Sequence, residues 1–326
     1  MADSIRWGIL GAGGIAAVVG PEIAAEPGNE VVAVGARDLG RATGLADTLG
    51  ATRAYGSYAE LVADPDVDVV YVATTQGQHH DHALLALRAG KPVLVEKPFT
   101  LNARQAREVI AQARQRHLFC MEGMWMRLNP LIIRAQEIAA SGRIGDLISV
   151  HADLSRLFEY DPKNRVYDLS LGGGALLELG VYPATFAWLF FGRPGTVQTI
   201  GALSPTGADA STAMQWGYRG GRFAQISCSA QGTNPLTGLV AGSKGWISIG
   251  GRVHRAPYIN VHDESGDEEL RQTIKGAGFD HEIAEVARCL RAGELESPLV
   301  PLDETIAILE VLDEARAQLG VRYAAD

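Results

Sequence analysis

Short apolar runs alternate with longer segments of helical periodicity through roughly the first 125 residues. A strand buried on both faces reads as a continuous apolar run, so we predict strands at residues 5–10, 30–35, 67–73, 92–95 and 117–121. Apolar positions that recur every three or four residues predict helices at 39–49, 57–63, 79–89 and 102–116. Strands and helices that alternate in this way are typical of βαβ units. The pattern therefore predicts a doubly wound α/β fold around a parallel sheet.

The pattern changes beyond residue 129, where one helix (130–141), one strand (147–154) and a strongly apolar helix (174–190) come first. Alternating apolar and polar positions then predict an antiparallel sheet, with strands at 198–203, 211–218, 222–231, 238–242, 246–250 and 258–263. Helical periodicity returns at 279–292 and 303–319, and the last helix has an apolar face that could pack back on the first domain. We predict two domains, 1–125 and 126–326, the second of α+β type.

Composition excludes several classes of partner. The 326 residues carry a formal net charge of −9, which opposes binding to nucleic acid. We expect no membrane span, because the apolar stretches at 67–74 and 175–191 are short or contain polar residues. The first strand begins too early for a leader, and Cys120, Cys228 and Cys289 lie far apart in apolar surroundings, as free thiols do. We therefore expect a cytoplasmic protein.

A glycine-rich turn joins the first strand to the helix that follows it. Gly11-x-Gly13-x-x-Ala16 has the form of a dinucleotide-binding fingerprint with alanine in the third position. Ordinary turns also use glycine, but the position directly after an N-terminal strand favours a cofactor loop. The first glycine allows the tight turn, the second lets the backbone approach a pyrophosphate, and Ala16 allows close packing. We predict that the cofactor is bound by Gly11, Gly13, Gly14, Ile15 and Ala16.

The end of the second strand indicates which nicotinamide cofactor is used. Enzymes that use NAD often carry an acid there, whereas this chain has Ala36-Arg37-Asp38. The Arg37 guanidinium can pair with a 2′-phosphate and stack on adenine, which favours NADP. Asp38 either caps the next helix or lies close enough to the ribose to allow NAD.

Two further clusters carry candidate chemistry. Glu96-Lys97-Pro98 follows a strand, at the carboxyl edge where ligands bind in this topology; the alternative is that Lys97 is an ordinary solvated lysine. Glu178 and Tyr182 lie four residues apart in an apolar helical segment, and this spacing predicts that they share one helix face. A buried acid needs a partner or a role; the alternative is a locally paired Glu178 and a Tyr182 that packs in the core.

In this order, the glycine turn, Glu96-Lys97-Pro98 and the segment from Gly172 to Tyr182 resemble the glucose-fructose oxidoreductase, inositol dehydrogenase and MocA family along nearly the whole chain. Residues 54–61, 121–127 and Tyr182 resemble most closely its branch of dimeric dihydrodiol dehydrogenases and NADP-dependent D-xylose dehydrogenases. The resemblance implies a Rossmann domain followed by a domain with an open, mostly antiparallel sheet. It also implies a homodimer, or a dimer of dimers, that forms through this sheet.

The resemblance also implies roles for individual residues. Lys97 and Tyr182 would be catalytic, with Glu178 standing where the family usually has aspartate. Trp125 and Arg127 would border the substrate and Arg165 would line the same pocket, although Trp125 could equally be a core aromatic. The family often has a Thr-Pro-Asn segment followed by a histidine. Residues 74–79 of this chain keep the threonine and the histidine but not the proline or the asparagine. The neighbours of the nicotinamide or its ribose would be Thr74, Gln76, His79 and Glu96.

These residues suggest hydride transfer between nicotinamide C4 and a carbinol carbon of a sugar, polyol or cyclic diol. Tyr182 would move the proton, and the Lys97 ammonium would favour its phenolate. We expect no metal, because the adjacent side chains of residues 79–82 point in different directions. Two alternatives remain: reduction of a keto sugar on the same scaffold, and a non-catalytic sensor that binds NADP.

Overall fold

A computed structural model describes residues 4–326 and divides the chain into two compact units. The first contains the residues up to Met124 together with Lys275–Ile306, and the second contains Trp125–Ile274 with Ala307–Asp326. The division expected from the sequence instead placed 275–306 in the second domain. In the structure, helix α8 (Asp280–Ala292) packs on α1 (Gly14–Ala25) of the first unit. Its periodicity showed that it has an apolar face but not which helix covers that face.

The first unit is built on a six-stranded parallel sheet in the order β3-β2-β1-β4-β5-β6, which confirms the predicted doubly wound fold. The short strand β3 was not predicted, and β6 begins after residue 117 because His117 ends the preceding helix in a left-handed conformation (φ 54°). The strands are β1 (Ile5–Leu10), β2 (Asn29–Gly35), β3 (Arg53–Tyr55), β4 (Val69–Val72), β5 (Val93–Glu96) and β6 (Cys120–Gly123).

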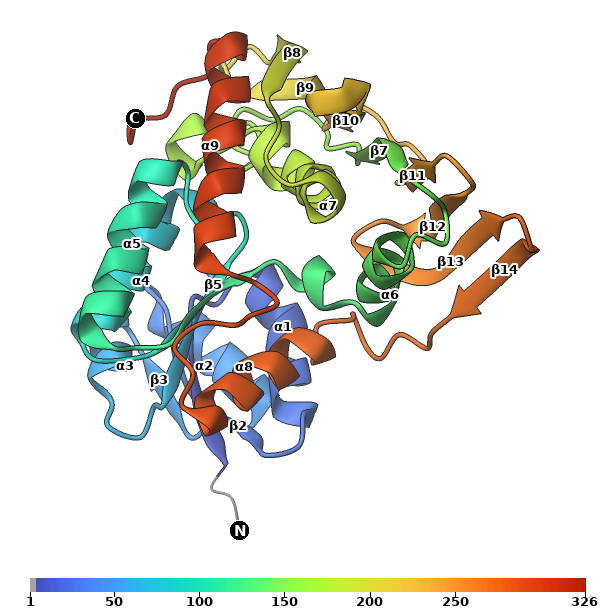
Figure 1. The fold of residues 1–326 in the computed structure, drawn as a ribbon. Coiled ribbons are helices and arrows are strands. Elements are labelled where there is room, and N and C mark those ends of the chain that lie inside the picture. Colours follow the sequence, from blue (N-terminus) through green and yellow to red (C-terminus); the bar gives the residue numbers. More distant parts are fainter. Residues whose placement is uncertain (1–3) are drawn as a thin grey trace. The chain divides into compact units, whose positions relative to one another are not determined.

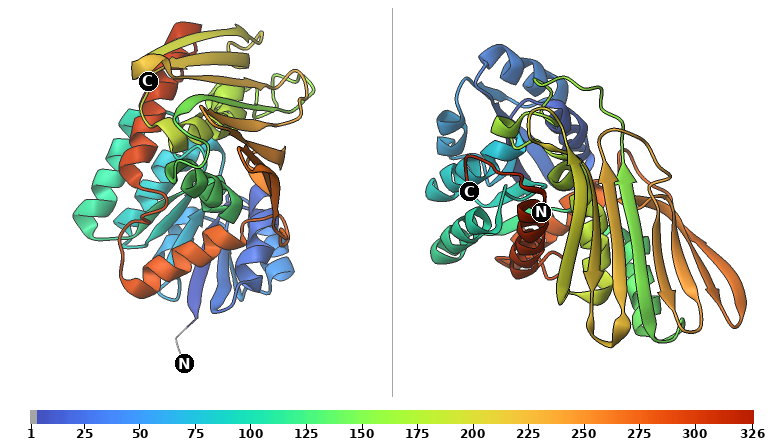
Figure 2. Two further views of the ribbon diagram at one scale, coloured as in Figure 1. Left: turned by 45° about the vertical axis from the view of Figure 1, so that its right-hand side comes forward. Right: turned by 90° about the horizontal axis from the view of Figure 1, so that it is seen from above.

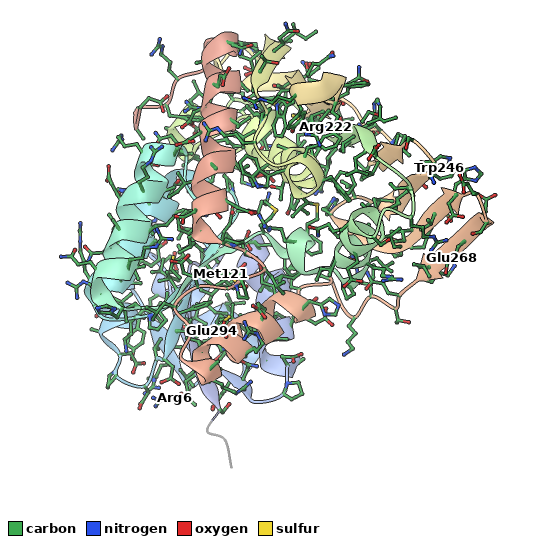
Figure 3. The ribbon with its side chains drawn as sticks, in the orientation of Figure 1. Arg6, Met121, Arg222, Trp246, Glu268 and Glu294 are labelled. Atoms are coloured by element: carbon green, nitrogen blue, oxygen red, sulfur yellow. The ribbon has the colours of Figure 1, made fainter. Side chains whose placement is uncertain are left out.

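Helices connect these strands and cover the sheet (Figure 1). Helix α1 contacts α2 and α8, whereas α4 contacts α3 and α5. Three helices begin at a capping side chain that accepts a backbone N–H, namely Asp38, Ser57 and Asn102. Arg6, labelled in Figure 3, ties β1 to the segment before β4 through Asp66 and Asp68. The helices not bounded above are α2 (Leu39–Leu49), α3 (Tyr58–Ala63), α4 (His79–Arg88) and α5 (Ala103–Arg116).

The second unit is built on an eight-stranded sheet in the order β14-β13-β12-β11-β7-β10-β9-β8. Strand β7 pairs with β10 in parallel and the other neighbours pair antiparallel, so the predicted mostly antiparallel sheet is confirmed. Strand β14 (GDEELR) was missed because its charged sequence lacks apolar alternation. The strands are β7 (Leu147–Ser155), β8 (Thr196–Leu203), β9 (Asp209–Gly217), β10 (Phe223–Ser229), β11 (Gly238–Gly242), β12 (Trp246–Arg252), β13 (Arg255–Asp263) and β14 (Gly266–Arg271).

One face of this sheet is covered by helices (Figure 2). Helix α7 (Val181–Phe191) packs on β7, β10 and β11, and α6 (Pro130–Ala140) packs on β13. Helix α9 (Leu302–Leu319) begins in the first unit and contributes residues from Ala307 onward to the second. The sheet exposes large apolar side chains, including Ile148, Ile200 and Trp246.

The helical stretch Leu169–Phe191 corrects one expectation from the sequence. It is long and apolar enough, by length and composition alone, to cross a membrane, with a mean hydropathy of 1.4. The expectation rested on residues 175–191 alone, whereas the helical stretch begins at Leu169. Its most apolar 18-residue window is 78% buried within the second unit. Buried core helices have the same apolar composition.

Candidate functional site

The glycine turn between β1 and α1 has the backbone that a dinucleotide loop requires. Gly11 has φ +115°, and a Cβ there would lie 2.8 Å from the carbonyl oxygen of Ala73. A Cβ at Gly13, the N-cap of α1, would come no closer than 4.0 Å to that oxygen, and Gly14 has open space around it. Ala16 is fully buried. Gly11 therefore shapes the turn, whereas Gly13 and Gly14 leave room above the helix start for an anion.

Two arginines follow the end of β2, Arg37 before helix α2 and Arg41 in its first turn. Arg37 is exposed, and Asp38 caps α2 by accepting the Arg41 amide at 3.0 Å. The Arg41 guanidinium donates to the carbonyl of Ala12 in the glycine turn at 2.7 Å. Arg41 was not among the predicted site residues, because only its contact with Ala12 relates it to the glycine turn and the sequence carries no signal for that contact. Two cations thus stand near the place where the adenosine ribose of a dinucleotide would lie.

The loops after β4 and β5 are joined by a buried histidine. The Nδ1 of His79 lies 2.8 Å from the carbonyl oxygen of Pro98, and its Nε2 lies 3.2 Å from that of Thr74. Burial lowers the pKa of His79 to about 4, and the nearby Lys97 charge adds to the effect. Gln76 is also buried in this loop. His79 therefore acts as a neutral brace at the carboxyl edge of the sheet.

The other two histidines of this run have different partners. His80 contacts Asp81 and Glu108, and His82 contacts the Thr74 hydroxyl at 2.9 Å. Burial lowers the pKa of His82, and Arg37 is close enough to contribute. No group of three metal-binding side chains lies together among residues 4–326. The run is thus a set of separate contacts.

Lys97 stands directly after the buried end of β5. The Glu96 carboxylate accepts the Tyr71 hydroxyl at 2.5 Å and the Lys97 amide at 3.1 Å, and Glu96 is 4% exposed. The Lys97 side chain is half-buried, and the peptide to Pro98 is cis. Glu96 therefore fixes the backbone from which the ammonium projects.

Three aromatic rings meet in the second unit around Tyr182. The indole Nε1 of Trp125 donates to the Tyr182 hydroxyl oxygen at 2.8 Å, and both residues are buried. His254, in the turn between β12 and β13, places its ring 5.0 Å from Tyr182 and 5.6 Å from Trp125 between centroids. Arg127, two residues after Trp125, is also buried. His254 was not among the predicted site residues, because a single histidine in a turn carries no local sequence signal.

Glu178 lies in a π-helical turn, Leu176–Gly180, that leads directly into α7. The Arg165 guanidinium holds both of its carboxylate oxygens at 2.7 Å, with Arg165 half-exposed and Glu178 largely buried. The regular α-helix expected for Glu178 and Tyr182 is therefore wrong at this point. The backbone there is a π-turn rather than a regular α-helix, and the shared face of the two residues stays a prediction.

Comparison with known proteins places this geometry in context. Residues 5–124 match the sequence model of the GFO/IDH/MocA oxidoreductase family, described as having an NAD-binding Rossmann fold. Residues 132–248 match the model of the GFO/IDH/MocA C-terminal domain.

Several relatives resemble the whole chain. The trans-1,2-dihydrobenzene-1,2-diol dehydrogenase of Mus musculus is 37% identical over 99% of both chains, and that of Homo sapiens is 35% identical over the same shares. Among solved structures, a 3-ketoreductase from Actinomadura kijaniata, in complex with NADP and TDP-benzene, has a TM-score of 0.86 at 27% identity, covering 97% of this chain and 98% of its own. An aldose-aldose oxidoreductase from Caulobacter crescentus shares the fold, with a TM-score of 0.88 at 21% identity over the same shares.

Proposed function

This chain belongs to the glucose-fructose oxidoreductase, inositol dehydrogenase and MocA family of NAD(P)-dependent oxidoreductases, and from that premise we propose that it oxidises a cyclic diol, sugar or polyol with NADP. The observation that carries this proposal is the buried Tyr182 hydroxyl, which accepts the Trp125 N–H inside a wall of aromatic rings. Such a cluster would offer flat faces to a ring and one acid/base group to a hydroxyl.

The residues of the first unit suit a dinucleotide. The space beside Gly13 and Gly14 admits a pyrophosphate, because no Cβ occupies it. We assign Arg37 and Arg41 to the 2′-phosphate, which would select NADP, while Asp38 is already engaged as a helix cap. Ile15 and Ala16 complete the first turn of α1, and Thr74, Gln76, His79 and Glu96 would border the nicotinamide ribose. When bound, the nicotinamide supplies the hydride acceptor.

Tyr182 would take the proton of the substrate hydroxyl as its carbon loses hydride. The Trp125 N–H donates to the phenol oxygen and therefore favours the phenolate, because hydrogen bonds to a charged form stabilise it. We assign Lys97 the complementary role: its ammonium, fixed by the Glu96 end of β5, would favour the same phenolate by its charge.

The remaining polar residues would orient the substrate. Arg165 and Glu178 form an ion pair in the unit that carries Tyr182. We propose that their charged groups form hydrogen bonds with substrate hydroxyls. Arg127 would lie in the same pocket, and His254 adds a ring that can also form a hydrogen bond. The relatives named trans-1,2-dihydrobenzene-1,2-diol dehydrogenase favour a cyclic diol among the substrates.

A screen of cyclic diols, pentoses, hexoses and inositols with NADP and NAD tests the proposal. With the best substrate, Tyr182→Phe and Lys97→Met should each lower kcat by about 10² or more while the enzyme still binds NADPH. Tyr218→Phe and Lys244→Met are matched controls outside the pocket and should keep full activity. Unchanged turnover in both pocket variants would refute the mechanism.

Reduction of a keto sugar is a second candidate, favoured by the 3-ketoreductase whose structure this chain resembles at 27% identity. The same pocket would then run in reverse, with the Tyr182 phenol giving its proton to a carbonyl oxygen. Kinetics in both directions separate the two functions. Efficient NADPH oxidation with keto sugars and slow diol oxidation would favour the reductase.

We also propose that the chain forms a homodimer, or a dimer of dimers, through the open face of the eight-stranded sheet. A hollow of about 480 Å³ on this face is lined by residues that include His151, Asp153, Gln198 and Ile200, and Ile200 is 75% exposed. On the same sheet Trp246, labelled in Figure 3, stacks on His262. Light scattering should give twice the chain mass or a multiple, and Ile200→Asp should shift it toward the monomer. A monomeric wild type would contradict the proposal.

We propose a cytoplasmic location because the three cysteines are free thiols. Cys120, Cys228 and Cys289 are buried free thiols, as expected in a reducing compartment. Fractionation of the source cells should recover the activity with cytosolic markers.

A further inference from the structure

Within the second unit, two side chains from distant segments hold the glycine-rich turn that precedes Glu178 and Tyr182. Asp209, the first residue of β9, accepts the Leu176 amide at 2.6 Å. Tyr323, in the segment that follows α9, donates its hydroxyl to the carbonyl of Gly173 at 3.0 Å. The Leu176 contact lies at the first residue of the π-helical turn, and the Gly173 contact lies three residues before it.

Asp209 is placed inside the unit rather than at its surface, with 1% exposure. One carboxylate oxygen, Oδ2, accepts both the Leu176 amide and the Thr212 hydroxyl. The other, Oδ1, has no hydrogen-bond partner in the described part of the chain and lies against Gly174, where any side chain would collide with it. Gly174 has φ +145°, so this position requires glycine on two counts. The glycine turn therefore leaves the space that the Asp209 carboxylate occupies, and the carboxylate binds the backbone that follows the turn.

Tyr323 is anchored from its own side. The Arg316 guanidinium, on α9, stacks 4.6 Å above the Tyr323 ring and pairs with Asp326 at 2.6 Å. Asp326 in turn accepts the Tyr323 amide at 2.8 Å. Tyr323 is 5% exposed and Arg316 is also buried. The segment 321–326 therefore presents a fixed hydroxyl to the glycine turn.

The turn needs such support, because a π-helical turn is rare and occurs mostly as a single turn inside a longer helix. Glu178 lies within it, and Tyr182 follows two residues after it ends. A displacement of about 1 Å in groups that act on a substrate can cost on the order of 10² in rate. Contacts that fix residues 173–176 therefore bear directly on where the reacting groups stand.

We propose that Asp209 and Tyr323 are positioning residues for the reaction. They fix the backbone of the glycine turn, and with it the Glu178 carboxylate and the Tyr182 phenol, and the hold is stronger when Asp209 is ionised. The role in the reaction rests on the proposed function, whereas the hold on the turn does not.

The environment of Asp209 shifts the pH at which its charge changes. Burial raises its pKa to about 6, against the opposing effects of its hydrogen bonds and of Arg316. Above that pH the carboxylate gives the Leu176 amide a charge-assisted hydrogen bond, and below it the bond weakens. The titratable groups that face it are Cys228 of β10, Arg316 of α9 and Tyr323.

Two variants test the proposal, with a control on the same helix. Tyr323→Phe removes the hydroxyl and Asp209→Asn removes the charge. Tyr218→Phe removes an equivalent hydroxyl that donates to the carbonyl of Gly192 at the other end of α7. Both test variants should lower kcat about tenfold with an unchanged KM for the cofactor, since one net hydrogen bond is worth about that factor. The wild-type rate should rise through about pH 6, and Asp209→Asn should lack this limb.

Hydrogen exchange gives a readout that needs no activity. Amides of residues 174–182 should exchange faster in both test variants and at the wild-type rate in Tyr218→Phe. Unchanged exchange in both variants, or an intact pH limb in Asp209→Asn, would overturn the positioning role. A wild type that exchanges as expected but turns over no substrate would instead refute the proposed function and leave the hold on the turn standing.

Discussion

The two units build their candidate sites by different means. In the first, the backbone does most of the shaping: Gly11 turns the chain, Gly13 leaves room for an anion, and Lys97 stands where β5 ends. In the second, Trp125 and Tyr182 lie 57 residues apart and meet only through their side chains. A site made of strand ends and turns tolerates changes in its surroundings better than one in which each ring depends on the placement of another.

The two regions also respond to acid in opposite directions, and this is the largest effect we predict. Burial lowers the pKa of His79 from 6.5 to about 4, so its contribution to stability is full above pH 6.5 and is lost as pH falls toward 4. At about 1.36 kcal/mol per pH unit, this loss is about 3 kcal/mol. The free energies of unfolding of the wild type and of His79→Gln, measured with urea, should therefore approach each other by about that amount between pH 7 and pH 4.

The pH dependence of stability due to Asp209 has the opposite sign. Its pKa is raised from 3.8 to about 6, so its buried charge costs stability above pH 6 and this cost disappears toward pH 3.8. The free energy of unfolding of the wild type should therefore rise relative to that of Asp209→Asn as pH falls. A constant wild-type advantage over His79→Gln at all pH values would show that His79 is not held neutral.

The role of backbone space in the first unit can be tested at Gly13. A methyl group there touches no protein atom closer than 4.0 Å, so Gly13→Ala should fold normally. The same methyl would occupy the space needed by a pyrophosphate, and we expect cofactor affinity to fall about 100-fold. Gly44→Ala, in α2 with nothing within 4 Å, should bind normally and gain up to about 1 kcal/mol in stability. Equal binding by both variants, measured by NADPH fluorescence, would contradict the assignment of the glycine turn.

What the sequence could predict follows from this difference. The glycine spacing, the strand before Lys97 and the caps at Ser57 and Asn102 are local signals, so the parallel fold and the cofactor turn could be inferred from the amino-acid sequence alone. His254 and the Arg165 partner of Glu178 come from distant segments. The π-turn has no sequence signal of its own, because its residues read as a regular apolar helix.

A smaller effect is expected where the first unit uses side chains rather than backbone. Arg37→Ala should raise the KM for NADP about 30-fold and Arg41→Ala somewhat less, since a charged hydrogen bond is worth about 2 kcal/mol. The KM for NAD should change little in either variant, because NAD lacks the 2′-phosphate. Kinetics with both cofactors measure the ratio. An equal loss for NADP and NAD would assign these arginines a structural role.

The smallest predicted effect lies in the aromatic pocket. Trp125→Phe keeps a ring against His254 but removes the N–H that the Tyr182 oxygen accepts. Loss of one hydrogen bond to a developing phenolate should lower kcat about three- to tenfold. Because the phenolate then forms less readily, the limb on which the rate of diol oxidation rises with pH should move to higher pH. Trp246→Phe, which alters an exposed tryptophan stacked on His262, is the matched control and should leave the profile unchanged. If Trp125→Phe lowered kcat without moving the limb, the indole would serve only as packing, and the distinction drawn between a backbone-built and a side-chain-built site would fail at its most specific contact.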